Sequence, residues 1–368
     1  MVTKTIRAAV IRAAGSPWTI ENVQLEEPRE DEILVRMVGV GICHTDLLCK
    51  SGNFPVLMPI VLGHEGAGVV EKVGSKVGRV AVGDHVVMSF DSCGLCRNCH
   101  QHNPGYCFEF FPRNFSGGRK ADGSSPIQGN DAPIHASFFS QSSFATYAIA
   151  REASAVVVDR ALPLEILGPL GCGVQTGAGA VANSLGLLRG DSLAIFGAGA
   201  VGLSALLAAR ALGAGTVIVV EPNEKRGAFA MELGATQVIN PKTIVDVLGE
   251  IKKSGGVNFA FDTTGIPEVI GTAIETLLPG GVLGMVGGPP PDATLPANLM
   301  SMLIRGVSAK YIIEGDADPQ TFIPRMLEWY RAGKFPFDRL VRKFPFDQIN
   351  QAAHAAETGD VIKPVLVF

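Results

Sequence analysis

The sequence has few charged residues, no large excess of positive or negative charge and no long unbroken apolar run. Charged residues make up 18% of the 368 positions and the formal net charge is −4, which argues against a basic face for nucleic acid. The uncharged stretch of residues 193–209 is broken by three glycines, so a buried strand running into a helix is expected rather than a membrane span. Residues 1–11 contain Lys4 and Arg7 and no apolar core of signal-peptide type. A cytoplasmic protein is therefore expected.

The seven cysteines are unevenly distributed. Four of them lie within fifteen residues, and others stand beside histidine or glycine-rich turns. Disulfides are one explanation for cysteines in a chain of this size. Their clustering favours metal ligands in a reducing compartment.

The length predicts two domains, because single hydrophobic cores rarely exceed ~250–300 residues. Residues 5–160 show short strand-like runs, such as 33–40 and 68–73, separated by Gly, Pro and Asp turns. From about Val174 the pattern changes. Strand-like runs at 192–196, 216–220 and 258–262 alternate with helical stretches at 200–212 and 225–233. This alternation predicts an α/β domain with a doubly wound parallel sheet.

The last part of the chain no longer follows this alternation. A helix is expected at residues 319–333 and a strand at 362–368, and we expect that strand to return to the first domain. Residues 307–313 are the candidate edge strand of the parallel sheet. Residues 108–139 are rich in Gly, Ser, Asp and aromatic side chains, which is typical of a long surface loop near a site.

A glycine-rich motif follows the strand-like run at 192–196 and opens a helix-like run. Gly197 would permit a tight turn, Gly199 the close approach of a pyrophosphate, and Gly202 close packing of helix on strand. A purely structural turn is the alternative. Glu221, nineteen residues beyond Gly202, favours a dinucleotide, since an acid there can bind both ribose hydroxyls. Its charge would repel a 2′-phosphate, which favours NAD over NADP, although Glu221 could also cap a helix.

Four cysteines in one loop, Cys93, Cys96, Cys99 and Cys107, are enough to complete a tetrahedral zinc shell. We expect a structural zinc there. An iron–sulfur cluster is the weaker alternative, because its usual spacing ends with three residues and Cys-Pro, whereas seven residues precede Cys107.

A second metal site would combine Cys43, His64 and Cys172 from distant segments. Three protein ligands leave a fourth position for water or an alcohol, the arrangement of a catalytic zinc. Each residue alone has another explanation, since either cysteine could be a small core residue and a single histidine is usually packed or on the surface. Their combination favours the metal site. Asp46 is a candidate acceptor for the second ring nitrogen of His64, and could otherwise be a cap or turn residue.

The motifs together resemble the zinc-containing medium-chain alcohol dehydrogenases. Residues 63–77 match that family's zinc motif, and the four-cysteine loop, residues 171–177 and residues 197–202 follow in the family's order. Residues 110–117, 138–147 and 334–338 are most similar to bacterial aryl (benzyl) alcohol dehydrogenases.

The resemblance implies a GroES-like β-rich catalytic domain, residues 1–173 and 312–368, and a Rossmann domain, residues 174–311. It implies two zinc ions per subunit and reversible oxidation of primary alcohols, aryl or allylic, with NAD. It also implies a homodimer or homotetramer, often joined through the edges of the Rossmann sheets.

The resemblance also assigns roles to individual residues. Thr45 would accept the alcohol proton, but many relatives have a histidine three residues later, where this chain has Leu48. His44 stands at a pyrophosphate-contacting position and would either replace that histidine as base or only bind phosphate. Glu65 would lie behind the metal, with a purely structural carboxylate as the alternative. The resemblance further assigns Val201, Thr176 and Lys363 to the cofactor, Lys363 as a second phosphate-binding cation or else a solvated lysine.

Three other functions remain open at this point. A zinc-free quinone or enone reductase of the same superfamily lacks the three ligands found here. The second alternative is a dehydrogenase of S-(hydroxymethyl)glutathione or of general aliphatic alcohols. An enzyme for the glutathione conjugate would need cations in its pocket to bind the peptide carboxylates. A non-catalytic NAD-binding protein would have little use for a three-ligand metal site.

Overall fold

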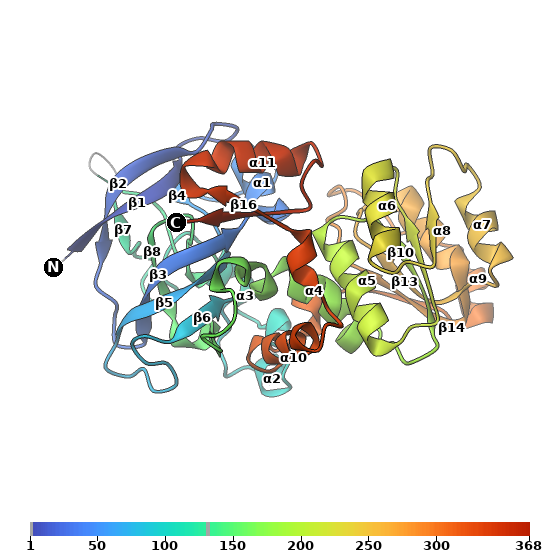
Figure 1. Ribbon diagram of the computed structural model, residues 1–368, viewed down its shortest axis with the longest axis horizontal. Coiled ribbons are helices and arrows are strands. Elements are labelled where there is room, and N and C mark those ends of the chain that lie inside the picture. The colour runs from blue at the N-terminus through green and yellow to red at the C-terminus, as the bar shows by residue number, and fades with distance from the viewer. Residues whose placement is uncertain (1–2, 130–132) are drawn as a thin grey trace. The chain divides into compact units, whose positions relative to one another are not determined.

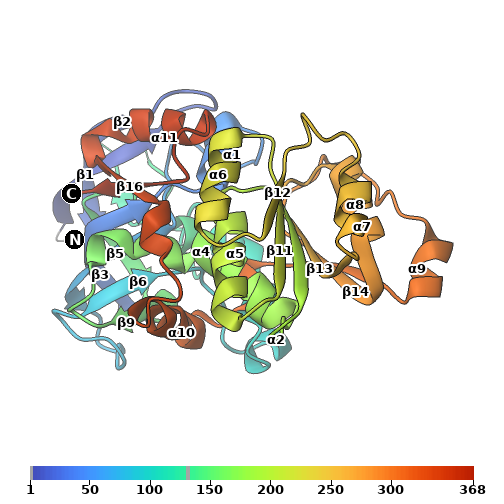
Figure 2. The same cartoon turned by 45° about the vertical axis from the view of Figure 1, so that its right-hand side comes forward.

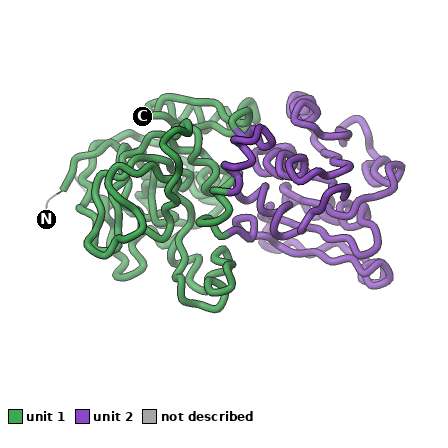
Figure 3. The backbone as a smooth tube through the Cα atoms, turned by 60° about the horizontal axis from the view of Figure 1, so that its bottom comes forward, with its two compact units in different colours: residues 1–173, 318–324, 338–368 green, residues 174–317, 325–337 purple. Residues whose placement is uncertain are grey.

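The computed structural model describes residues 3–129 and 133–368, and the chain divides into two compact units (Figure 3). Residues 1 and 2, and residues 130–132 of the predicted loop 108–139, lie outside the described residues. Unit 1 comprises Met1–Gly173, Asp318–Pro324 and Asp338–Phe368, and unit 2 comprises Val174–Ala317 and Arg325–Phe337. None of the helices among the described residues has the length and hydrophobicity to span a bilayer.

Unit 1 contains two β-sheets. The larger has the order β16-β17-β3-β5-β6-β9, with β8 also paired to β3, and the smaller has the order β4-β1-β2-β7. Figure 1 labels β3, β5 and β6 of the larger sheet and β1, β2 and β4 of the smaller. The strands are β1 Thr3–Ile11, β2 Thr19–Glu26, β3 Glu32–Gly41, β4 Ile60–Val61, β5 Glu65–Val73, β6 His85–Met88, β7 Ile127–Gln128, β8 Tyr147–Arg151, β9 Ala155–Val158, β16 Val341–Pro345 and β17 Lys363–Val367. The helices are α1 His44–Ser51, α2 Arg97–His100, α3 Phe110–Asn114 and α11 Ile349–Glu357.

The final strand returns to unit 1 as predicted. β17 pairs antiparallel with β3, with Leu366 opposite Val40, and parallel with β16. The larger sheet therefore contains strands from both the first part and the last part of the chain. This pairing places Lys363, the first residue of β17, beside the end of β3.

Unit 2 is the predicted doubly wound domain. Its six parallel strands follow the order β12-β11-β10-β13-β14-β15. They are β10 Ser192–Phe196, β11 Thr216–Val220, β12 Gln237–Ile239, β13 Val257–Asp262, β14 Leu277–Met285 and β15 Ser308–Tyr311. The helices are α4 Gly173–Gly179, α5 Ala200–Leu212, α6 Glu224–Glu232, α7 Val247–Lys253, α8 Pro267–Thr276 and α9 Leu299–Arg305, while α10 Pro319–Arg331 is divided between the units at Pro324.

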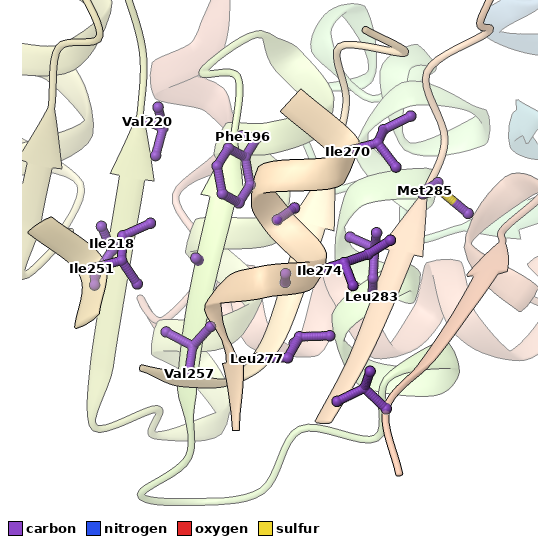
Figure 4. Packing of buried hydrophobic residues seen from close by; sticks show 14 of the residues in the cluster. Phe196, Ile218, Val220, Ile251, Val257, Ile270, Ile274, Leu277, Leu283 and Met285 are labelled. Carbon is purple, nitrogen blue, oxygen red and sulfur yellow. The ribbon is translucent and has the colours of Figure 1, made fainter. Parts of the chain in front are cut away.

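Helices cover both faces of this sheet, with α5 and α6 on one face and α7 and α8 on the other (Figure 2). On the second face Ile270 and Ile274 of α8 pack with Phe196 and Leu283 from the strands (Figure 4). A strand covered by helices on both faces needs apolar side chains on both sides, so its sequence is a continuous apolar run. This is why the buried strand β10 could be predicted from the sequence. β15 lies at the end of the strand order, so the predicted edge strand is confirmed.

The second domain boundary differs from the prediction. Residues 312–317 were expected in the catalytic domain, but they belong to unit 2, as do residues Arg325–Phe337. The backbone N–H of Ile312 donates to the carbonyl of Met285 (2.8 Å), and Gln175 donates to Glu314 (3.3 Å). The first contact continues the pairing with β14 beyond the end of β15, and the second joins Glu314 to α4 of the same unit. A count of strands and helices could not show either contact.

Candidate functional site

Cys43, His64 and Cys172 meet in unit 1. Their candidate ligand atoms all lie within 4.8 Å of one another. Cys43 is the N-cap of α1, His64 precedes β5, and Cys172 precedes α4. His64 is fully buried and Cys172 nearly so. Three segments far apart in sequence therefore bring two sulfurs and one imidazole together.

Asp46 fixes two of these ligand segments. One carboxylate oxygen accepts from the backbone N–H of Cys43 (3.0 Å), which closes a capping box at the start of α1. The other accepts from the N–H of Gly63 (3.1 Å) and contacts Nδ1 of His64 (3.1 Å). The contact predicted between Asp46 and His64 is present. It places the ring proton on Nδ1 and leaves Nε2 directed at the thiols.

The donor set fits a metal ion. Nε2 of His64 is buried and has no hydrogen-bond partner among the described residues. A buried polar atom without a partner is costly, and a bound cation would remove that cost. The pKa of the Cys43 thiol lies well below its usual value, because the hydrogen bond with Cys172 favours the thiolate and outweighs the opposing effect of burial. The cluster therefore favours the thiolate form that binds zinc.

A buried ion pair lies behind the three ligands. Nζ of Lys363 is 2.9 Å from each carboxylate oxygen of Glu65, and both side chains are almost completely buried. Lys363 also donates to the carbonyl of Ile42 (3.2 Å), and Glu65 accepts from the N–H of Gly173 (3.0 Å). Burial opposes the charge on Lys363, but Glu65 outweighs it and raises the pKa of the ammonium.

This ion pair gives Lys363 a different partner from the phosphate predicted for it. The residues it joins are the sequence neighbours of all three ligands: Ile42 precedes Cys43, Glu65 follows His64, and Gly173 follows Cys172. Glu65 does lie beside the ligand cluster, as the resemblance implied. Its carboxylate is held by Lys363 and the backbone.

The four cysteines of the second cluster also converge. Their sulfurs lie within 4.8 Å of one another, and Cys99 is 3.8 Å from Cys93 and 3.5 Å from Cys96. Ligands ~2.3 Å from a tetrahedral zinc would be ~3.8 Å apart, so the spacing suits one ion. No disulfide joins any of the seven cysteines, all within the described ranges. Backbone N–H groups, first that of Phe108, lower the pKa of Cys96 to about 6.

The glycine motif in unit 2 has the geometry of an anion-binding turn. Gly197 has a φ of 99°, and a Cβ on Gly202 would overlap the carbonyl oxygen of Gly197. A Cβ on Gly199 would meet nothing within 4 Å, which leaves open space where a ligand would approach. Val201 packs its carbonyl against Gly177 of α4, next to Thr176.

Glu221 lies at the end of β11 and is nearly buried. Its oxygens accept from the N–H of Ala198 (2.7 Å) and of Asn223 (2.8 Å). The cap of α6 is Asn223, which accepts from Lys225 and Arg226, so the alternative that Glu221 caps this helix is wrong. The carboxylate is instead fixed beside the glycine motif, the position expected for a ribose-binding acid.

Two residues of the proposed proton path lie at the start of α1. Thr45 is half-buried, with its hydroxyl oxygen 3.8 Å from the sulfur of Cys43, while His44 is exposed. Leu48 follows one turn later on the same helix. Within α1, therefore, the hydroxyl adjoins the ligand cluster and the histidine faces solvent.

An aromatic cluster from the 108–139 segment adjoins His64, and this was not foreseen in detail. The ring of Phe139 stacks on the imidazole (centroids 4.4 Å, 24° between planes), and Phe138 meets it edge-on at 5.5 Å. Phe115 connects Phe139 to Phe54, at 4.9 and 4.8 Å. The many phenylalanines of this segment were the only feature of the sequence that indicated an aromatic cluster. It did not show that one ring would contact a candidate ligand.

Comparisons with known proteins agree with this architecture. Residues 29–160 match the alcohol dehydrogenase GroES-like domain family, and residues 200–331 match the zinc-binding dehydrogenase family. The geraniol dehydrogenase of Castellaniella defragrans is 56% identical over 98% of this chain and 97% of its own. A crystal structure of benzyl alcohol dehydrogenase from Acinetobacter calcoaceticus is 44% identical, covers 99% of both chains and gives a TM-score of 0.96.

A further crystal structure, an alcohol dehydrogenase zinc-binding domain protein from Burkholderia ambifaria, is 49% identical over the whole of both chains with a TM-score of 0.97. These similarities cover nearly the full length of the chain and therefore include both units. On these similarities, the chain belongs to the zinc-dependent, NAD(P)-binding alcohol dehydrogenases of the medium-chain family.

Proposed function

We propose that this enzyme oxidises primary aryl or allylic alcohols reversibly to aldehydes, with NAD as hydride acceptor. The observation that carries the proposal is the phenylalanine cluster adjoining the three-ligand site, with Phe139 stacked on His64. Flat apolar substrates gain affinity from an aromatic wall, at roughly 25 cal/mol per Å² buried. The relatives named for geraniol and benzyl alcohol support the same substrate class.

The proposal assigns a catalytic zinc to Cys43, His64 and Cys172, and a structural zinc to Cys93, Cys96, Cys99 and Cys107. The catalytic ion, when bound, supplies a Lewis acid that lowers the pKa of an alcohol hydroxyl. Asp46 keeps the tautomer of His64 in which Nε2 faces the ion. Glu65 and Lys363 keep the backbones of the ligand segments together. Since both sites need reduced thiols, we propose that the enzyme works in the cytoplasm.

Proton transfer in this proposal begins at Thr45. Its hydroxyl lies next to Cys43 and accepts the proton of the alcohol. With Leu48 in place of a histidine, the exposed His44 either carries the proton onward or binds cofactor phosphate only. Comparison of the pH–rate profiles of the wild type and His44→Arg distinguishes these two roles.

An alcohol panel tests the substrate class. Formation of reduced cofactor, followed by absorbance, should give kcat/KM values for geraniol, cinnamyl and benzyl alcohol at least ~10-fold above that for ethanol, because burial of each extra methylene contributes ~0.8 kcal/mol. S-(hydroxymethyl)glutathione should be a poor substrate. Equal kcat/KM values for ethanol and benzyl alcohol would refute the aryl and allylic preference.

Metal analysis tests the two zinc sites. The wild type should hold two zinc ions per chain, and Cys43→Ser and Cys99→Ser about one each. Cys43→Ser should lose turnover by ~10³-fold, since the Lewis acid contributes several kcal/mol to transition-state stability. Cys99→Ser should instead lower the melting temperature.

The control for metal analysis is Cys49→Ala, because Cys49 is buried outside both clusters and burial raises the pKa of its thiol. This variant should keep both ions. A single ion in the wild type, or full turnover in Cys43→Ser, would contradict the proposed metal centre.

Cofactor choice is assigned to Glu221. Glu221→Gln should lower kcat/KM for NAD by ~10- to 100-fold and narrow the preference over NADP, because a hydrogen bond to a charged group contributes ~1.5–3 kcal/mol. The amide can still accept a backbone N–H, so the fold is retained. Glu224→Gln, at an exposed acid three residues later, is the matched control. An unchanged NAD:NADP ratio in Glu221→Gln would exclude this role.

We propose that the enzyme is a homodimer or homotetramer whose subunits meet at the edge of the unit 2 sheet. β15 is the last strand in the order, and α9, which precedes β15 in the chain, exposes four large apolar side chains: Leu299 (77%), Met300 (62%), Leu303 (74%) and Ile304 (76%). Such a patch is unusual on a monomer. Leu303→Asp should lower the molar mass seen by light scattering, whereas Val245→Asp, exposed elsewhere in unit 2, should not.

A further inference from the structure

The segment of residues 137–142 has an unusual backbone. Ser137, Phe139, Ser140 and Ser142 all adopt positive φ angles, between 49° and 65°. Residues with a Cβ rarely adopt this region, and a run of them persists only where the surroundings impose it. The segment therefore has contacts that outweigh the unfavourable backbone conformation.

Those contacts are made with the residues that directly precede His64. The hydroxyl of Ser142 donates to the carbonyl of Val61 (2.6 Å), and the N–H of Phe144 donates to that of Leu62 (3.0 Å). The N–H of Ser143 donates to the carbonyl of Gly63 (2.9 Å). Residues 142–144 thus hold the three residues that precede His64.

Gln141 holds His64 itself. Its side chain is 2% exposed, and its Nε2 donates to the carbonyl of His64 (3.0 Å) and to that of Ser89 (3.3 Å). Its Oε1 accepts from the N–H of Gly66 (3.1 Å). Both ends of the carboxamide are used, and none of these contacts involves the side chain of a metal ligand.

Ser89 extends the connection to the third ligand. Its hydroxyl, fully buried, donates to the carbonyl of Gly171 at 2.6 Å. Gly171 precedes Cys172 directly. A chain of hydrogen bonds therefore leads from the backbone of His64 through Gln141 and Ser89 to the backbone next to Cys172.

We infer that Gln141 is a positioning residue of the catalytic metal site, holding the backbone of His64 and, through Ser89, that of Cys172 at the separation the ion requires. The inference rests on the zinc site of the proposed function. The two ligand segments are far apart in sequence, so only tertiary contacts can set their spacing. The strained conformation of residues 137–142 is what delivers the carboxamide to this position.

Two substitutions separate hydrogen bonding from packing at this position. Gln141→Met keeps the length of the side chain and removes its hydrogen bonds, while Gln141→Glu keeps the shape but cannot donate to the two carbonyls when ionised. The control is Thr276→Val, which removes one buried hydrogen bond outside the ligand segments, from the Thr276 hydroxyl to the carbonyl of Ala273 at the end of α8.

The measurement is the rate at which zinc passes from the folded protein to a chromogenic chelator. Cys43→Ser, which keeps only the four-cysteine ion, identifies the release phase of that ion. Both Gln141 variants should release the catalytic ion ~10- to 100-fold faster, with the four-cysteine phase unchanged. Thr276→Val should stay within ~3-fold of the wild type. The absorption bands of the cobalt-substituted protein should shift in the Gln141 variants only, because a distorted ligand geometry changes them.

Release from the Gln141 variants at the wild-type rate would overturn the inference, and so would equal acceleration in Thr276→Val. If neither Gln141 variant folds, Ser89→Ala decides, because it removes only the hydroxyl that holds Gly171. Faster release of the catalytic ion from Ser89→Ala supports the inference and an unchanged rate overturns it. A wild type with a single ion would refute the proposed function itself, whereas two ions with unaffected variants would refute only the role of Gln141.

Discussion

The buried ion pair of Lys363 and Glu65 is the contact on which the geometry of the ligand cluster depends. Two charges this deeply buried are tolerated only when paired and hydrogen-bonded, and loss of one partner costs about 3–5 kcal/mol. Here the remaining hydrogen bonds are made to the backbone at Ile42 and Gly173. The two charges must stay paired in the protein interior, and their pairing therefore holds together the segments that carry all three ligands.

The sheet of unit 1 makes this pair possible. β17, from the last part of the chain, pairs with β3 and starts with Lys363, while β5 starts with Glu65. The approach of the carboxylate requires glycine at position 41, because a Cβ there would overlap a carboxylate oxygen of Glu65. The absence of a side chain at Gly41 therefore makes room for the carboxylate of Glu65 at the end of β3.

The ligand cluster is polar on one side and aromatic on the other. Asp46 satisfies the Nδ1 side of His64, and Phe139 covers the face of its ring. An apolar cover limits the access of water and strengthens the electrostatic interactions beneath it. The same rings that stabilise the ligand therefore provide the apolar surface proposed to receive the alcohol. Substrate preference and ligand geometry are then linked through one segment, residues 137–142.

Much of this could be predicted from the sequence because the signals are local. The strands 192–196 and 216–220 and the helix 200–212 match β10, β11 and α5, since apolar strands and a glycine turn lie within one stretch of chain. The four-cysteine cluster follows from short spacing, and the contact of Asp46 with His64 from the need of a metal-bound imidazole for an acceptor at its second ring nitrogen. What only the tertiary structure decided are contacts between distant positions. Lys363 pairs with Glu65, 298 residues away, and Gln141 reaches His64 across 77 residues, while residues 312–317 extend unit 2. No local pattern encodes such contacts, because they arise only when sheet pairing brings the two segments together.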